Sequence, residues 1–185
     1  PLTNIGLAIH QESNILPKIK EIVLMGGALR EGGNITPSAE FNIYVDPEAA
    51  QIVLRCGRPI VMMSLDVTHQ VLTTRNRVDA IRNLDSTVGK PIASLIEFYE
   101  RYDEEKYHLD GAPLHDPCTI AYLIKPDLFS LKEVNVEVET GGKFTRGATV
   151  VDYWDVTGRL PNVQWAHTVD ANGFFELLNN YLSKI

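Results

Sequence analysis

Glu21-Ile22-Val23-Leu24-Met25 and Pro59-Ile60-Val61-Met62-Met63-Ser64-Leu65 are the two stretches that decide the fold class. Each is a short, continuous apolar run, as expected for a strand buried on both faces. Between them lie a polar loop from Ala28 to Val45 and a helix that Asp46 caps and Gly57 closes. A strand, loop, helix and strand at this spacing predict a parallel sheet with helices on its faces.

Local signals on either side of this unit predict the other elements. Thr3 or Asn4 can cap a first helix that runs to about His10. Valines alternate with polar residues from Val134 to Val138, as on a strand with one wet face, and Gly141-Gly142 separates this strand from a second. The other expected elements are helices from Thr74 to Leu84, Val88 to Tyr107, Asp116 to Lys125 and Asp170 to about Leu182, and strands from Phe144 to Asp152 and Val163 to Val169. We therefore expect an α/β fold whose open, mostly parallel, Rossmann-like sheet carries a C-terminal antiparallel hairpin.

Size and composition indicate a single domain, residues 1–185, with one sizeable core, because the chain has 185 residues of which 44% are hydrophobic. The net charge is −7, with 17 basic against 24 acidic residues and no Lys/Arg-rich run. Nucleic acid and anionic membranes are therefore unexpected partners. No apolar stretch reaches the roughly 18 residues of a membrane span, and the first residues lack the basic start of a signal peptide, so we expect a cytoplasmic protein.

Cysteine, histidine and glycine spacing excludes several kinds of site. Cys56 and Cys118 lie in predicted helices without C-x-x-C spacing, so we expect buried free thiols. The histidines are scattered, and any metal would be a hard, oxygen-bound ion such as calcium. Gly26-Gly27 and Gly32-Gly33 match no phosphate-binding spacing and are interpreted as turn glycines.

Amide and carboxylate side chains follow the first parallel strand, at the edge where open α/β sheets bind ligands. Asn34, Glu40 and Asn42 suit a ligand with several hydroxyl groups, and the alternative is ordinary solvated loop polarity. Further along, Phe98, Tyr99, Tyr102 and Tyr107 lie on one predicted helix; most are expected to pack, and one or two near its end could stack on a flat ring.

His115 and Asp116 stand side by side in Gly111-Ala112-Pro113-Leu114-His115-Asp116-Pro117, just before an apolar helix. Asp116 followed by Pro117 is also how a helix begins, and Asp46-Pro47 has the same pattern. From these residues alone, His115 can be structural and Asp116 a helix cap, or the pair can serve catalysis.

Six segments, spread over essentially the whole chain, together resemble the inosine-uridine-preferring nucleoside hydrolases. They are Met25-Gly26-Gly27-Ala28, Gly33-Asn34, Ala39-Glu40-Phe41-Asn42-Ile43, Asp46-Pro47-Glu48-Ala49-Ala50, Leu65-Asp66-Val67-Thr68 and Leu114-His115-Asp116-Pro117. The Ala-Glu-Phe-Asn segment is the most specific. Within the family, residues 115–121 and 149–153 look closest to the bacterial pyrimidine-specific ribonucleoside hydrolases.

This resemblance implies hydrolysis of the N-glycosidic bond of a ribonucleoside such as uridine or cytidine, giving ribose and free base. Such cleavage passes through an oxocarbenium-like transition state, here with a water activated by bound calcium as nucleophile. The resemblance also implies a homo-oligomer.

Site residues are carried over from the family position by position. Asn34, Glu40 and Asn42 match contacts to ribose hydroxyls, and Met25 lines the sugar pocket. Asp116 is similar to a calcium-ligating aspartate, Thr3 to a threonine that offers its backbone carbonyl to the metal, and His115 to the histidine that helps the base depart. Tyr107, and after it Tyr102, are expected to contact the substrate.

One family feature has no counterpart in these 185 residues. Family members begin with a strand that ends in an Asp-x-Asp-x-Gly-x-Asp-Asp segment, which supplies most calcium ligands and the water-activating base. We therefore expect a C-terminal part of a nucleoside hydrolase that needs an N-terminal segment or chain carrying this motif, and that alone neither binds calcium well nor turns over substrate. The alternative is a truncated, non-catalytic relative that acts as a sugar-binding or interaction module.

Overall fold

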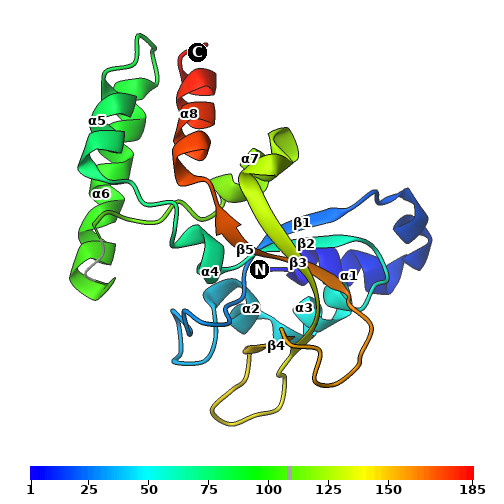
Figure 1. Ribbon diagram of the computed structural model, residues 1–185. Helices are drawn as coiled ribbons and strands as arrows, with labels where there is room; N and C mark the ends of the chain where they lie inside the picture. The colour runs from blue at the N-terminus through cyan, green and yellow to red at the C-terminus, as the bar shows by residue number, and fades with distance from the viewer. Residues whose placement is uncertain (108–109) are drawn as a thin grey trace. The chain divides into compact units, whose positions relative to one another are not determined.

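The computed structural model describes the backbone of residues 1–107 and 110–185 and the side chains of residues 1–99 and 110–185. The chain divides into two compact units. The first comprises residues 1–67 and 130–168, and the second residues 68–129 and 169–185. Figure 1 traces the elements of both.

The first unit is built on a five-stranded sheet of order β1-β2-β5-β3-β4. Strand β1 (Ile22–Met25) pairs in parallel with β2 (Ile60–Met63), and β2 pairs in parallel with β5 (Val163–Val169). Strand β3 (Phe129–Val138) pairs antiparallel with β4 (Thr149–Asp152), from Asn135 opposite Asp152 to Val138 opposite Thr149. The mostly parallel α/β fold and its antiparallel hairpin are confirmed.

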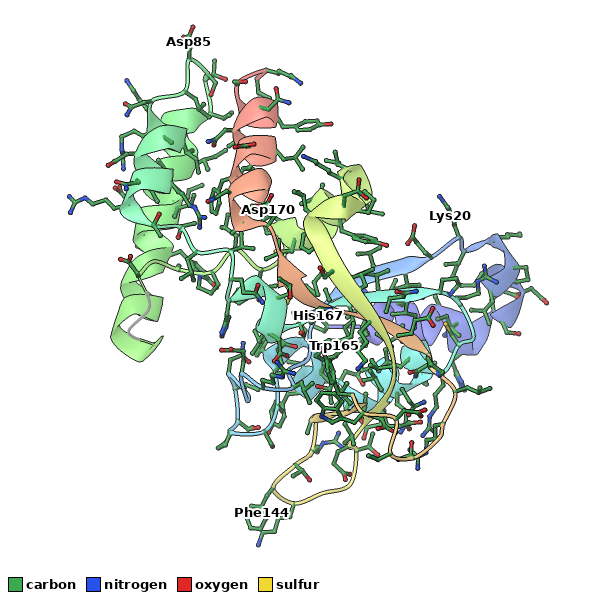
Figure 2. The ribbon with its side chains drawn as sticks, in the orientation of Figure 1. Lys20, Asp85, Phe144, Trp165, His167 and Asp170 are labelled. Atoms are coloured by element: carbon green, nitrogen blue, oxygen red, sulfur yellow. The ribbon has the colours of Figure 1, made fainter. Side chains whose placement is uncertain are left out.

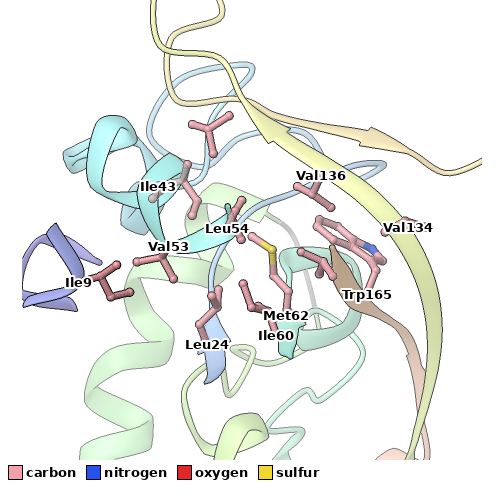
Figure 3. Close-up of a cluster of buried hydrophobic side chains, with 13 residues drawn as sticks. Ile9, Leu24, Ile43, Val53, Leu54, Ile60, Met62, Val134, Val136 and Trp165 are labelled. Atoms are coloured by element: carbon pink, nitrogen blue, oxygen red, sulfur yellow. The ribbon is translucent and has the colours of Figure 1, made fainter. Parts of the chain in front are cut away.

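Helices α1 (Thr3–Gln11) and α3 (Pro47–Leu54) pack against each other in this unit. They cover one face of the sheet because every second residue of the strands joins a common core with them. Trp165 of β5, 1% exposed, lies beside Val134 and Val136 of β3 (Figure 3). The core residues are Ile9, Leu24, Ile43, Ala50, Val53, Leu54, Ile60, Met62, Val134, Val136, Val138, Val163 and Trp165.

Helices make up most of the second unit. Helix α5 (Arg75–Arg82) packs on α6 (Gly89–Tyr107) and on α8 (Ala171–Leu182). Helix α7 (Pro117–Ile124) and the 3₁₀ turn η2 (Pro126–Leu128) also contact α8. Asp170 caps α8 by accepting the amide of Gly173 at 3.0 Å, at the position labelled in Figure 2. No helix within the described part of the chain is long and apolar enough to cross a membrane.

Several element boundaries differ from the sequence prediction. The expected loop from Ala28 to Val45 ends in a short helix, α2 (Phe41–Val45), and the second hairpin strand begins at Thr149, not at Phe144. Phe144 is exposed at the tip of the loop between the hairpin strands (Figure 2). Leu65, expected at the end of a strand, begins helix α4 (Leu65–Thr68). A further 3₁₀ turn, η1 (Ser13–Lys18), lay outside the prediction.

The cap of α1 was predicted wrongly. Leu2 is the N-cap residue and no side chain caps this helix. The Thr3 hydroxyl donates instead to Oδ2 of Asp46 at 2.6 Å, while Oδ1 of Asp46 accepts the amide of Ala49 at 3.0 Å. Asp46 therefore caps α3 as predicted, and Gly57, with φ +72°, closes it in the left-handed conformation.

Candidate functional site

A hydrogen-bonded cluster forms where β1 ends. Gly26 and Gly27 follow the strand, and Glu40 reaches back to them from the start of α2. Glu40 is 2% exposed, and Oε2 of its carboxylate accepts the amides of Gly27 at 3.0 Å and Ile43 at 3.2 Å. Its Oε1 accepts the amide of Asn42 at 2.9 Å. Glu40 therefore caps α2 and fastens it to the strand end.

Burial raises the pKa of the Glu40 carboxyl above its usual value, although the three backbone amides that it accepts act in the opposite direction. Both carboxylate oxygens already bind backbone amides. The structure thus gives Glu40 a supporting role that sequence reasoning missed, and its expected contact with ribose stays a prediction.

Asn42 and Asn34 are held in the same cluster. The amide nitrogen of Asn42 donates to the carbonyl oxygen and to Sδ of Met25, each at 3.3 Å. Oδ1 of Asn34 accepts the amide of Phe41 at 2.8 Å. The structure thus brings together Met25, Asn34, Glu40 and Asn42, the four residues expected on the sugar side.

A second carboxylate secures the loop that leads into this cluster. Asp66, at the start of α4, accepts backbone amides from Leu29, Arg30 and Glu31 at 2.8, 2.6 and 3.3 Å. The Asp66 segment entered the sequence analysis only as part of a family motif. Because its partners lie some 35 positions earlier in the chain, no local pattern reveals this contact.

His115 lies in the second unit with Thr68 and His69. Its Nδ1 is 2.8 Å from the Thr68 hydroxyl, and the rings of His69 and His115 have their centroids 5.7 Å apart. Burial, followed by the effect of His69, lowers the pKa of His115 to about 4, against the opposing charge of Asp116. His115 is therefore neutral near pH 7.

Asp116 is not a cap, although its sequence pattern matches that of Asp46. It occupies the N-cap position of α7 in αR conformation, and its side chain makes no capping hydrogen bond. The carboxylate is exposed. Of the two sequence alternatives for Asp116, the cap is thus excluded, and the ligand role stays a prediction.

A short antiparallel bridge holds the His115 loop in place. Leu72 pairs with Pro113, the amide of Thr73 donates to the carbonyl of Ala112 at 2.9 Å, and the amide of Leu114 donates to the carbonyl of Val71 at 2.9 Å. Gly111 allows this close approach at φ +120°, where an added Cβ would lie 2.6 Å from the Thr73 carbonyl oxygen.

Residues expected near the flat ring of a base are only partly described. Tyr102 and Tyr107 are part of helix α6, but the structure does not describe their side chains. Phe98 and Tyr99 are 71% and 62% exposed, so neither is buried in a core of the described residues.

The cysteines are free, as predicted, and only Cys118 is fully buried; Cys56 is half-buried. Burial, followed by the charge of Asp116, raises the pKa of Cys118 to about 12. Its Sγ lies 3.1 Å from the carbonyl oxygen of Leu114, to which it donates. The Cys118 thiol therefore lacks the environment of a nucleophile.

The described residues do not by themselves fit a calcium site. They contain no group of three or more His, Cys, Asp or Glu side chains able to hold a metal ion, whereas calcium takes about six to eight oxygen ligands. Thr3 lies in the first turn of α1, and the expected metal contact of its carbonyl stays a prediction, as does that of Asp116.

Comparison with known proteins places these residues in a family context. The family model described as inosine-uridine preferring nucleoside hydrolase matches residues 1–176. The pyrimidine-specific ribonucleoside hydrolase RihA of Salmonella paratyphi B is 48% identical over 179 residues, which cover 96% of this chain and 57% of that protein. An uncharacterised protein of Schizosaccharomyces pombe is 48% identical over 186 residues, covering 100% of this chain and 60% of that protein.

Two solved structures have the same fold over the whole chain. A plant nucleoside hydrolase, PpNRh1, matches with a TM-score of 0.89 at 34% identity and is covered to 60%. A purine-preferring ribonucleoside hydrolase from Gardnerella vaginalis matches with a TM-score of 0.88 at 37% identity and is covered to 58%. The chain thus spans about three fifths of the length of these relatives.

Proposed function

The chain belongs to the inosine-uridine preferring nucleoside hydrolases, and we propose that the whole protein hydrolyses the N-glycosidic bond of ribonucleosides, with pyrimidine ribonucleosides preferred. The observation that carries this proposal is the clustering of Met25, Asn34, Glu40 and Asn42 at the carboxyl end of β1. The pyrimidine preference is supported by the likeness to RihA. The similar protein from Gardnerella vaginalis is named a purine-preferring hydrolase, so the preference for pyrimidine over purine nucleosides is to be measured directly.

The sugar side of the proposed reaction depends on orientation. The amide nitrogen of Asn42 is bound to Met25, and we expect the Asn42 Oδ1 atom to accept the hydrogen bond from a sugar hydroxyl. Glu40 fixes the backbone of Asn42, and the Phe41 amide fixes the Asn34 side chain. Groups fixed in this way lose little freedom when ribose binds, and a glycosidic bond held in one orientation reacts faster.

The base side is assigned to His115. A neutral imidazole carries one N–H, and the hydrogen bond to Thr68 at Nδ1 decides which nitrogen holds it. When the Thr68 hydroxyl donates to Nδ1, the proton resides on Nε2, which then donates a hydrogen bond to the departing base. His115 thus assists departure as a neutral donor, because few molecules carry a charged imidazolium near pH 7.

We also propose calcium as the cofactor of the whole enzyme, with Asp116 and the Thr3 carbonyl among its ligands. The resemblance to the family supports this assignment, and the remaining oxygen ligands would come from residues outside these 185. Bound calcium would supply Lewis acidity at the nucleophilic water. The residues of this chain bind the sugar and assist the leaving base.

Three other properties are proposed. Both compact units belong to one nucleoside hydrolase domain and the enzyme is a homo-oligomer, as the resemblance implies, and the enzyme works in the cytoplasm. Light scattering coupled to size-exclusion chromatography of the whole protein measures the oligomeric state, and a monomer would refute that proposal.

The activity is tested with the whole protein that contains this chain, incubated with uridine, cytidine, inosine and calcium. We expect release of uracil and ribose from uridine, with inosine cleaved more slowly. Asn42→Ala should lower kcat by more than its effect on KM, because orientation in the transition state is lost. No base release from any nucleoside by folded protein would favour the non-catalytic sugar-binding or interaction module instead.

A further inference from the structure

The loop from Ala28 to Asn34 is unusually well secured at both ends. At its start, the Thr149 hydroxyl accepts the amide of Ala28 at 3.0 Å and donates to the Ala28 carbonyl at 2.6 Å, and both bonds are buried. At its end, the amide of Asn34 donates to the carbonyl of Ala39 at 3.1 Å. In the middle of the loop, the backbone amides of Leu29, Arg30 and Glu31 all donate to one side chain, that of Asp66.

Asp66 binds this middle segment with both carboxylate oxygens. Oδ2 accepts the amide of Leu29, and Oδ1 accepts those of Arg30 and Glu31. The hydroxyl of Ser64, fully buried, donates to Oδ2 at 3.1 Å and so fixes the carboxylate itself. Three successive amides aimed at one anion form a strong backbone anchor, because hydrogen bonds to an ionised acceptor exceed neutral ones.

The path from this anchor to Asn34 is short and stiff. Only Gly32 and Gly33 separate Glu31 from Asn34, and the Gly33 amide donates to the carbonyl of Pro37 at 3.1 Å. A Cβ on Gly33 would lie 2.0 Å from the Thr36 carbonyl oxygen, so the turn there is closely packed. Because this turn is short and closely packed, we expect a displacement of Leu29 to Glu31 to shift Asn34, even though Asn34 also bonds to Ala39 and Phe41.

We propose that Asp66 is a positioning residue of the sugar site: it holds residues 29–31 so that Asn34 presents its side chain to ribose. This inference rests on the proposed nucleoside hydrolase function. Asp66 reaches Asn34 through the loop backbone that it binds, not through a contact with substrate. Removal of its carboxylate should therefore reproduce the kinetic defect of removing Asn34.

The test uses the whole enzyme with Asp66→Ala and Asn34→Ala, singly and combined, and measures kcat and KM for uridine. Asp66→Ala should lower kcat/KM about tenfold or more. In the Asn34→Ala background the same change should have less than a twofold effect, because the side chain that Asp66 positions is gone. Independent, multiplying effects would overturn the proposal.

A matched control separates positioning from loss of stability. Asp152 also accepts two backbone amides and a hydroxyl, from Val156 and Thr157, but it secures a turn that carries no proposed site residue. Asp152→Ala should lower the melting temperature and leave kcat/KM within twofold of wild type. An equal loss of kcat/KM in both variants would show a general stability effect and refute the positioning role.

Two further measurements keep the outcomes distinct. If Asp66→Ala fails to fold, Asp66→Asn retains one accepting oxygen and should give a smaller loss of kcat/KM, with Ser64→Ala smaller still. Rates with 2′-, 3′- and 5′-deoxyuridine show which hydroxyl Asn34 binds, and Asp66→Asn should weaken discrimination at that same hydroxyl. Active enzyme in which Asn34→Ala changes nothing overturns this inference alone, whereas an inactive wild type overturns the proposed function.

Discussion

The neutral state of His115 makes stability depend on pH in a definite direction. Burial lowers the pKa of its imidazole from 6.5 in the unfolded chain to about 4 in the folded protein. Above pH 6.5 both states leave the ring neutral, and the folded state has no disadvantage. As pH falls from 6.5 toward 4, only the unfolded chain binds the proton, so the free energy of unfolding decreases by about 1.4 kcal/mol per pH unit.

Between pH 7 and pH 5 the contribution of His115 should amount to a loss of about 2 kcal/mol. Urea unfolding at pH 7, 6 and 5 measures it, with His115→Asn as the comparison because Oδ1 of asparagine can accept the Thr68 hydroxyl in place of Nδ1. The variant should lose less stability than wild type over this range, by about the same 2 kcal/mol. Equal pH dependence of wild type and variant, or an NMR titration of His115 near pH 6.5, would refute the reasoning.

Three other predictions concern the same unit. Gly111→Ala forces a side chain to φ +120° beside the Thr73 carbonyl and should lower the free energy of unfolding by about 1 to 3 kcal/mol, read from the urea midpoint. Asp116→Ala should abolish calcium-dependent hydrolysis in the whole enzyme without lowering its melting temperature in calcium-free buffer, since this side chain caps nothing; unchanged calcium affinity by calorimetry would contradict the ligand role. Cys118, whose pKa is about 12, should resist a thiol reagent at pH 8 until urea unfolds the protein, whereas rapid modification in the native state would show access to its buried site.

The strands were largely predictable because their signals are local. Val163 to Val169 was predicted with the observed ends, and Ile22–Met25 within one residue of its start. A short apolar run next to glycines limits both the type of element and its length. The helix α2 was missed because five residues are too few to show a helical period, and its cap is a glutamate.

The sequence was sufficient to predict which residues gather at the candidate site, but not which contacts each residue makes there. Asn34, Glu40 and Asn42 do gather at one strand end, which follows from sheet topology. Both carboxylate oxygens of Glu40 accept backbone amides, and this can be seen only once the folded path of the loop is known.

Asp46 and Asp116 show the same limit. Each precedes a proline and a helix, yet Asp46 caps its helix with φ −149° and ψ 77°, whereas Asp116 has φ −62° and ψ −36°. The difference originates in tertiary contacts, since the bridge between residues 71–73 and 112–114 sets the approach of the chain to Asp116.

The strand order of the first unit also determines when its sheet can be finished. Strand β5 is the last of these five strands in chain order, yet it lies between β2 and β3. During synthesis, β1 and β2 emerge from the ribosome first, followed by β3 and β4. These four strands form two separate pairs until residues 163–169 emerge and join them. Until then, one long edge of each pair and the pocket for Trp165 lie open, so cotranslational assembly of this sheet must wait for its central strand.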